Sequence, residues 1–570
     1  MPTSTICTPP MADPANSSPT PGGYIFKPHE RPMMPGSPAN PDHPASRKFA
    51  YFLIGAYLGI VGGFQNGLLL ANLTALQGHL DLTPVDAGWV TATYSMTNAC
   101  MSILLFKARQ QFGIQRFVRA VMLALLLANF LQLFDAGYRM ELVARGVSGV
   151  AASGLSTLAI FYLMQGVPAK ARLGGLLIGI GLTQVALPFA RAISPLLLAD
   201  GDVTNLFVLQ FALSLVAVGL VNILHLPPGE TIRSFEKLDL VTFPLLAAGV
   251  GLLCAFLIQG RIIWWSTPWL GGALAAALLL IGVAFLIEHN RANPMLHTRW
   301  MGSRDLLKFA LAGAFVRVLL SEQSFGSTGL LSALGMVNDQ LVTYYTLLTL
   351  ATLFGAILAV ARLDPNDLRR PTLISLAVIA VAAFADTHSG LLTRPANLYL
   401  TQAALAFAAV YFMGPMLMEG FVRALAKGPS YVISFLALFN LSQTLGGLAG
   451  VAALSAFHTL RTKAHLMMLG QSISTSNPGV AKAINDLAAS MSGTMTDPAL
   501  RSATAGAMVV QEAAREAAIL AFNDVFFVIG TGASLAFLIM AARWLYDRTR
   551  GFNPLAKELE ALQKMMTRNQ

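Results

Sequence analysis

The chain has 570 residues, of which 55% are hydrophobic and 12% are charged, and its net charge is +10. A soluble domain carries roughly 25% charged residues, so this composition excludes a water-soluble protein of this length. The basic residues lie in short segments between apolar runs, which favours topology signals of a membrane protein over a nucleic-acid-binding surface. The three cysteines show no metal-ligand spacing and suggest no disulfide framework.

Residues 1–48 are rich in Pro, Ser and Gly, which predicts a disordered N-terminal tail. This tail has no basic start followed by an apolar core, so we do not interpret it as a signal peptide. Fourteen apolar runs follow, each long enough to cross a bilayer as a helix. They are predicted at 50–73, 87–106, 117–134, 141–164, 174–197, 206–225, 239–260, 267–287, 306–324, 340–361, 371–387, 398–419, 430–456 and 519–545.

Lys and Arg are distributed unevenly over the loops between these runs. With the N-terminus inside, most of them fall in inner loops, whereas the short outer loops carry only Arg139, Arg261 and Arg394. This bias predicts that both termini are cytoplasmic. Residues 457–518 then form a long outer loop with two helix-like stretches, near 480–491 and 499–518. It is either a solvated cap over the outer mouth or a docking surface for a periplasmic partner.

Two segments carry a family resemblance. The junction LPPGETIRSFEKLDLVTFPLLAAGVGLL places Asp239 at the start of the seventh run, and LVARGVSGVAASG places Gly149 and further small residues after Arg145. Both resemble the EmrB/QacA-like branch of the major facilitator superfamily, which comprises drug:proton antiporters with fourteen helices. The resemblance implies an all-α membrane protein with two six-helix bundles and two linker helices. These parts would lie at 49–225, 305–545 and 226–304, followed by a cytoplasmic tail at 546–570.

Other segments depart from that branch. The turn after the second run, FKARQQFGIQR, keeps the basic residues but has Phe and Gln at the family's Gly and Asp positions. The resemblance implies a gating loop formed by Lys107, Arg109, Gly113 and Arg116. The fifth run keeps Pro188 but lacks the glycines around it, so proton coupling must use other groups.

Polar groups inside membrane spans are costly and usually functional. Glu322, with Arg145 or Arg317, is our candidate for proton coupling, although Glu322 at the outer interface and Arg145 reaching the outer surface are simpler alternatives. A second set offers hydrogen bonds and two positive charges to a small organic ligand. These cavity candidates are Gln65, Asn66, Gln184, Arg191, Gln323, Asn440 and Gln443. Four positions are predicted to shape helix packing: Gly149, Pro188, Gly446 and Gly450.

The chain contains no phosphate-binding loop, metal-site motif or nucleophile elbow, so we expect neither an enzyme nor a bound cofactor. The predicted function is proton-driven export of drugs or of aromatic or anionic compounds across a bacterial inner membrane. The resemblance further implies a periplasmic adaptor bound through 457–518 and an outer-membrane channel, and no nucleic acid. Two alternatives remain: a transporter dedicated to one metabolite, such as a siderophore or an aromatic acid, and a non-transporting receptor or scaffold.

Overall fold

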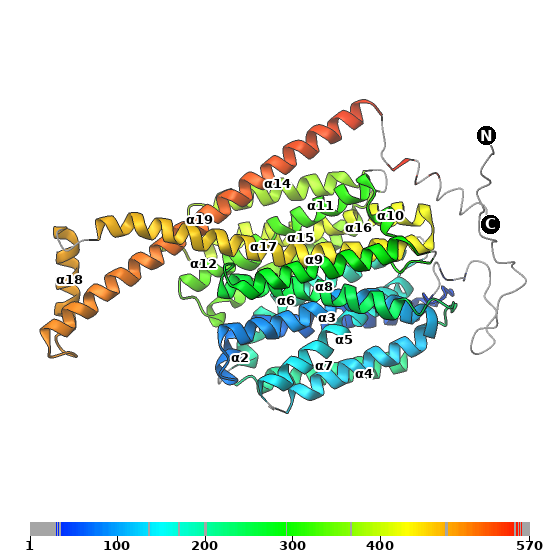
Figure 1. Ribbon diagram of the computed structural model, residues 1–570, viewed down its shortest axis with the longest axis horizontal. Helices are drawn as coiled ribbons and strands as arrows, with labels where there is room; N and C mark the ends of the chain where they lie inside the picture. Colours follow the sequence, from blue (N-terminus) through cyan, green and yellow to red (C-terminus); the bar gives the residue numbers. More distant parts are fainter. Residues whose placement is uncertain are drawn as a thin grey trace, which may run out of the picture.

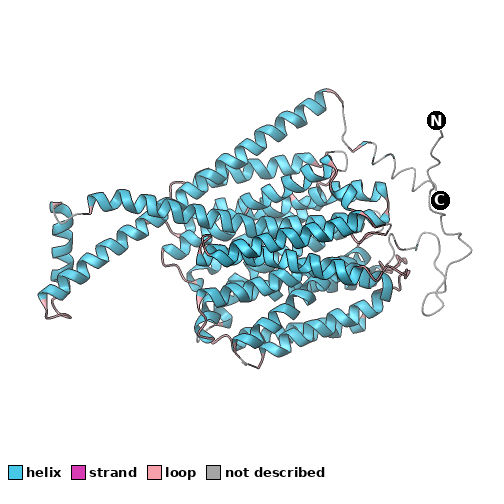
Figure 2. Ribbon diagram, viewed as in Figure 1, coloured by secondary structure: helices cyan, strands magenta, loops and turns pink. Residues whose placement is uncertain are grey.

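The computed structural model describes most of the chain between the two terminal segments. The described residues are 30, 32, 36–134, 137–168, 172–198, 202–291, 293–364, 367–473, 477–551, 555, 556, 558 and 560. Most of the two predicted tails therefore lies outside the described residues. Every regular element in the described ranges is a helix, as Figure 2 shows.

The first half of the fold is a helical bundle with the following elements: α1 (Ala45–Ala71), α2 (Leu73–His79), α3 (Pro84–Phe112), α4 (Ile114–Gln132), α5 (Tyr138–Gly166), α6 (Arg172–Leu197) and α7 (Thr204–Ile223). Two further helices connect the halves: α8 (Asp239–Ile263) and α9 (Pro268–His289). The second half contains α10 (Thr298–Met301), α11 (Arg304–Leu319), η3 (Glu322–Ser327), α12 (Thr328–Ala333), η4 (Asn338–Leu341), α13 (Val342–Ala361), α14 (Arg369–Asp386), η5 (Pro395–Leu398), α15 (Tyr399–Tyr411), α16 (Met413–Lys427), α17 (Pro429–Ser472), α18 (Pro478–Ser490) and α19 (Pro498–Thr549).

Each predicted span coincides with a helical stretch, and eleven helices in the described ranges are long and apolar enough to cross a membrane. The count of fourteen crossings stays a prediction, because α3, α11 and α14 are not among the eleven. Helix α3 is rich in Thr, Ser, Asn and Gln. Helix α11 gives way after Leu319 to the π-helical turn η3, and the 18 residues of α14 include three charges.

The helices pack as two bundles with the linker pair at their seam. Helix α5 contacts α1, α3 and α4, whereas α19 contacts α14 and α17. The bundles meet where α6 packs on α13 and α3 packs on α17, and α8 lies against both α3 and α17 (Figure 1). Small residues permit these close approaches. A Cβ added at Gly149 would lie 2.0 Å from Thr97 Oγ1, and one at Gly450 would lie 2.3 Å from Ser321 Oγ.

Helices α17 and α19 continue well beyond the bundle and are joined there by α18 (Figure 1). We call this projection the hairpin, the end of the bundle that carries it the hairpin end, and the opposite end the tail end. The interpretation of 457–518 as a cap over the mouth is wrong, since the segment projects away from the bundle. Asp524 of α19 accepts hydrogen bonds from Arg461 and His465 of α17, both at 2.6 Å, and so joins the two arms at their base.

The last part of the predicted disordered tail is packed against the first bundle. Ser37, Ala39 and Asn40 are buried, and the amide of Ala39 donates to the carbonyl of Pro228 at 2.9 Å. The side chain of Gln165 on α5 donates to the Ala39 carbonyl at 2.8 Å. Residues 36–44 therefore form part of the folded body at the tail end.

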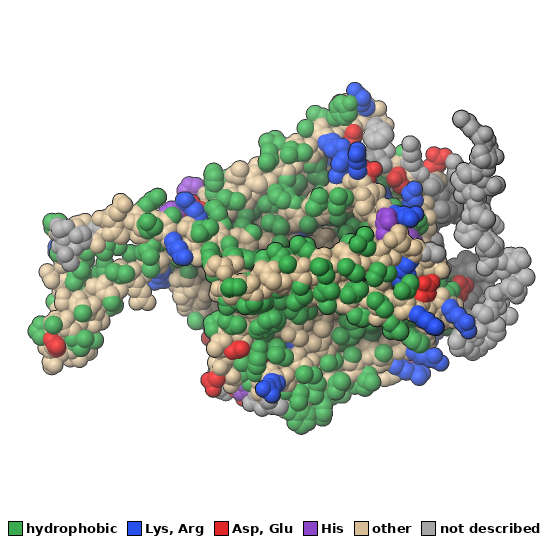
Figure 3. All heavy atoms as spheres, viewed as in Figure 1, with side chains coloured by type: hydrophobic (Ala, Val, Ile, Leu, Met, Phe, Trp, Pro, Cys, Tyr) green, Lys and Arg blue, Asp and Glu red, His purple; other side chains and the backbone are tan. Residues whose placement is uncertain are grey.

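Hydrophobic side chains dominate the face of the bundle seen in Figure 3, and charged side chains gather toward its ends. A bilayer requires this distribution, because its hydrocarbon core offers no partner for charged groups. The surface and the helix lengths together define a multi-pass membrane protein.

Candidate functional site

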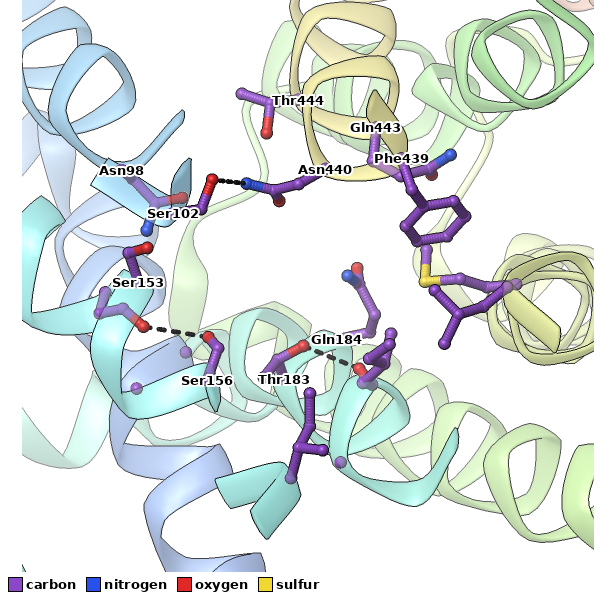
Figure 4. A pocket seen from close by; sticks show the side chains of 18 of the residues that line it. Asn98, Ser102, Ser153, Ser156, Thr183, Gln184, Phe439, Asn440, Gln443 and Thr444 are labelled. Atoms are coloured by element: carbon purple, nitrogen blue, oxygen red, sulfur yellow. Dashed lines mark hydrogen bonds between the residues drawn. The ribbon is translucent and has the colours of Figure 1, made fainter. Parts of the chain in front are cut away.

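A cavity of about 650 Å³ lies between the two bundles. Helices α1, α3, α5 and α6 line it from one side, and α11, η3, α13, α15, α16 and α17 line it from the other. Figure 4 shows polar side chains from both bundles around the open space. Asn440 of α17 donates to Ser102 Oγ of α3 at 3.2 Å, so the bundles touch through polar groups at this wall.

Six of the seven cavity candidates line this space: Asn66, Gln184, Arg191, Gln323, Asn440 and Gln443. Pro188 lines it as well. Gln65 does not, and this expectation is corrected. The side-chain oxygen of Gln65 accepts a hydrogen bond from Ser148 of α5 at 3.3 Å, so the amide is turned into the first bundle.

Sequence reasoning missed most of the polar wall on α3 and α5. Ser95, Asn98 and Ser102 line the cavity from α3, and Ser153 and Ser156 line it from α5. The three α3 residues recur at spacings of three and four, which puts them on one helix face. That periodicity is the signal that could have identified them.

The cavity is lined by three arginines, Arg109, Arg191 and Arg317, and its described lining contains no Asp, Glu or Lys. Arg109 lies between the rings of Phe106 and Phe161, with its guanidinium carbon 4.4 and 4.5 Å from the ring centres. None of the three arginines forms a salt bridge with a described residue. The cavity therefore carries uncompensated positive charge.

Arg191 and Arg317 differ in how they are held. Arg191 donates to Thr328 Oγ1 at 2.9 Å and to the hydroxyl of Tyr345 at 3.0 Å, both on the second bundle. The Arg317 guanidinium makes no hydrogen bond with any described residue and lies against Gly447, where an added Cβ would be 3.3 Å from Arg317 Nε. The missing side chain at Gly447 leaves room for this guanidinium beside the open space.

Arg145 is completely buried, so the alternative in which it reaches the outer surface is wrong. Its guanidinium donates to the backbone carbonyl of Gln65 and, at 2.8 Å, to the side-chain oxygen of Asn66. It also lies over the ring of Tyr94, 4.5 Å from the ring centre. Arg145 thus orients Asn66 and Tyr94, which line the cavity, from a position behind the wall.

Glu322 is also completely buried, so a position at the solvated interface is excluded. It forms no ion pair with Arg317. Instead, its Oε1 accepts a hydrogen bond from Gln402 Nε2 of α15 at 2.9 Å, and the same nitrogen donates to Asp386 Oδ2 of α14 at 2.8 Å. Sequence reasoning missed both Asp386 and Gln402. Glu322 faces the interior of the second bundle, whereas the adjacent Gln323 faces the cavity.

The predicted gating loop is not a loop. Lys107 and Arg109 belong to α3, Arg116 belongs to α4, and only Gly113 lies between these helices. Gly113 adopts a φ of 81°, a left-handed conformation that favours glycine, and it produces the sharp turn. The charges near this turn are organised by Lys107 Nζ, which lies 2.7 Å from Asp239 Oδ2.

Asp239 extends that contact to the linker at the tail end. Its other oxygen lies 2.8 Å from Arg291, which also contacts Glu288 at 2.6 Å and Glu236 at 2.8 Å. Burial opposes the charge on Arg291, but the hydrogen bonds to Glu236, Asp239 and Glu288 outweigh it and raise the pKa of Arg291. This cluster fastens the segments before α8 and after α9 to the linker pair, and Lys107 ties it to α3.

No family model matches the chain. The MFS-type transporter olcL of Penicillium canescens is 21% identical over 298 residues, which cover 48% of this chain and 50% of that protein. The match thus spans about half the length of this curated relative.

Solved structures resemble the chain over most of its length. The human organic anion transporter MFSD10 is 12% identical with a TM-score of 0.51, over 86% of this chain and 100% of that one. The proton:xylose symporter XylE is 13% identical with a TM-score of 0.51, over 91% and 100%. Tetrameric PepTSo2 is 13% identical with a TM-score of 0.54, over 88% and 99%. The protein has the major facilitator fold. Membership of the EmrB/QacA-like branch stays a prediction.

Proposed function

We propose that the protein is a secondary transporter that exports small organic molecules, and that organic anions with an aromatic part are its preferred substrates. The observation that carries this proposal is the cavity between the bundles, with three arginines and no acidic residue in its described lining. Guanidinium groups bind carboxylate and phenolate oxygens through charge-assisted hydrogen bonds. Phenylalanine, leucine and methionine side chains between the polar groups suit an aromatic ring.

Transport would proceed by alternating access, in which the bundles rock about the cavity. At the hairpin end the bundles are joined, because Asn338 donates to the carbonyl of Ala71 at 3.3 Å and to Ser194 Oγ at 3.4 Å. Away from the hairpin end, the cavity lining extends to Arg109 and Gln165 near the tail end. The excess of Lys and Arg at the tail end favours a cytoplasmic location for it, so the cavity would load from the cytoplasm and release outside.

Glu322 is the coupling candidate that we retain, with protons as the driving ion. Two structural observations support this choice. The Glu322 carboxyl group has no cationic partner among the described residues, and the next residue in the chain, Gln323, lines the cavity. Buried ionisable groups in membrane spans commonly serve proton relays.

The first experiment measures flux in proteoliposomes with three radiolabelled probes of one shape: naphthoate, naphthamide and a naphthylmethylammonium salt. We expect exchange of naphthoate to exceed that of the other two at least tenfold. Equal exchange of all three would remove the anion preference. Binding of naphthoate without exchange would instead support the receptor alternative, and exchange restricted to one compound of a wide panel would support a dedicated metabolite transporter.

We further propose that the hairpin is the docking surface for a periplasmic adaptor of an efflux assembly in a bacterial inner membrane, the adaptor in turn contacting an outer-membrane channel. Its support is the exposed apolar surface of the two arms beyond the bundle, which includes Leu460, Met467, Met468 and Val510. Removing α18 with the adjoining turns of α17 and α19 should abolish adaptor co-purification while naphthoate exchange persists. Unchanged co-purification would refute this proposal.

A further inference from the structure

The carboxyl groups of Glu322 and Asp386 share one hydrogen-bond donor. Gln402 Nε2 uses its two N–H groups to reach Glu322 Oε1 at 2.9 Å and Asp386 Oδ2 at 2.8 Å. All three residues are almost fully buried. Glu322 Oε2 and Gln402 Oε1 are buried without any hydrogen-bond partner in the described structure. The Thr401 side chain also faces the Asp386 carboxyl group, but the cluster is still incomplete, because Glu322 Oε2 and Gln402 Oε1 remain unused.

A proton completes this cluster better than a metal cation does. Two carboxylates this close in a water-poor site cannot both stay charged unless a cation compensates them. No Lys, Arg or His nitrogen lies within ion-pair distance of either one among the described residues. A donor nitrogen already occupies the position between the carboxylates, which disfavours a metal ion there. Among the titratable groups around the pair, Tyr344 of α13 faces Glu322, His388 lines the same pocket as Asp386, and His458 packs against the ring of Phe325 in η3.

Asp386 connects the cluster to the hairpin end. A second pocket, of about 390 Å³, is formed by residues of 385–398 and includes Asp386 in its lining. Ser389 also lines this pocket, and its backbone carbonyl accepts a hydrogen bond from the Asn523 side chain at the base of the hairpin. Neither Glu322 nor Gln402 lines this pocket. The acid pair thus has one member in the lining of a pocket at the hairpin end, whereas the other lies outside that lining.

Gln323 connects the same cluster to the central cavity. Its side chain lines the cavity and donates to the backbone carbonyl of Gln402 at 3.2 Å, next to the bridging amide. The carbonyl of Gln323 accepts from Thr328 Oγ1 at 2.9 Å, and Thr328 in turn accepts from Arg191 of the first bundle. A ligand that draws Arg191 or Gln323 toward itself would therefore move the residue that holds the two carboxyl groups together.

We propose that Asp386 and Glu322 form a single proton-binding site, bridged by Gln402, which is loaded from the pocket at 385–398 and not through the substrate cavity. Hydronium in the pocket gives its proton to the Asp386 carboxylate, so that one O–H bond breaks and one forms. The proton then exchanges to Glu322, and from there it leaves through the cavity beside Gln323 to the tail side. This inference rests on the proposed proton-coupled transport, to which it adds the second acid and the separate path.

The first test separates coupling from transport in proteoliposomes. Wild-type protein should concentrate radiolabelled naphthoate when a pH gradient is applied and exchange it when none is applied. Asp386→Asn and Glu322→Gln should each lose at least tenfold in gradient-driven accumulation yet keep exchange within about twofold, which also shows that they fold. The matched control is Asp339→Asn, an exposed carboxylate at the hairpin end, which should behave as wild type.

Failure of the acid pair is distinguishable from failure of the proposed function. Loss in Glu322→Gln with full accumulation in Asp386→Asn would overturn the paired site while leaving proton coupling intact. A wild-type protein that exchanges naphthoate but ignores the pH gradient, or follows a sodium gradient, would overturn proton coupling itself.

The second test examines the separate path. Leu392 lines the pocket and is exposed, so Leu392→Cys in a Cys7→Ser background can be modified by a membrane-impermeant cationic thiosulfonate from the hairpin side. Modification should slow gradient-driven accumulation severalfold and leave exchange unchanged. Val337→Cys, exposed at the same end but outside the pocket, is the control. Equal slowing of accumulation and exchange, or no effect on either, would refute loading through this pocket.

Discussion

Arg317 provides the sharpest test of the substrate class. It lines the cavity, and its guanidinium lies against Gly447 without a hydrogen-bond partner among the described residues, so this group is available to a ligand. A hydrogen bond to a charged group contributes about 1.5–3 kcal/mol, and every 1.4 kcal/mol corresponds to about a tenfold change in Kd. Arg317→Gln should therefore weaken naphthoate binding roughly 10- to 100-fold.

The same substitution should change the affinity for naphthamide, which has the same shape without the charge, by less than about threefold. Both affinities are measured by calorimetry on purified protein, with Arg299→Gln, an exposed arginine outside the cavity, as the matched control. Equal weakening for both ligands would show that Arg317 only supports the structure. Unchanged naphthoate binding would place the anion elsewhere and refute the reasoning.

Two further predictions concern stability. Gly149→Val should cost about 1–3 kcal/mol through overpacking, because the added Cβ would meet Thr97, whereas Gly219→Val, with open space around it, should not lower the thermal midpoint. A similar loss at both positions would contradict the packing account. The hydrogen bond from Arg291 holds the pKa of Glu236 below its ordinary value of 4.5. The stabilisation from this contact is therefore present above that value and lost as the pH falls further. Glu236→Gln should lower the midpoint slightly at neutral pH, and this difference should shrink as the pH falls below 4.5. A constant difference across this range would refute the ionic origin of the contact.

The membrane body could be predicted from the sequence because a bilayer imposes a length and an apolar composition on every crossing helix. The hairpin could not be delimited in the same way. Hydropathy falls where α17 and α19 leave the bundle, although the helices themselves continue to Ser472 and begin at Pro498. Apolar runs report where lipid ends, not where a helix ends, so 457–518 was predicted to be a loop.

The cavity was partly predictable and the acid pair was not. Consecutive residues on a helix point about 100° apart, so the sequence alone does not say which of Gln65 and Asn66 faces the cavity, and the packing shows that only Asn66 does. Gln402 is 80 residues from Glu322 in the chain and 16 from Asp386. No spacing rule joins residues on three different helices, and Asp386 resembles a residue that merely ends a span.

The central claim is that the bundles must separate at the hairpin end for substrate to leave. Ser194 of the first bundle and Asn338 of the second are in hydrogen-bond contact there. In a Cys7→Ser background, the pair Ser194→Cys and Asn338→Cys can be cross-linked by a short bifunctional thiosulfonate. The account predicts that cross-linked protein binds naphthoate but does not exchange it, and that reduction restores exchange. Full exchange by the cross-linked protein would contradict alternating access.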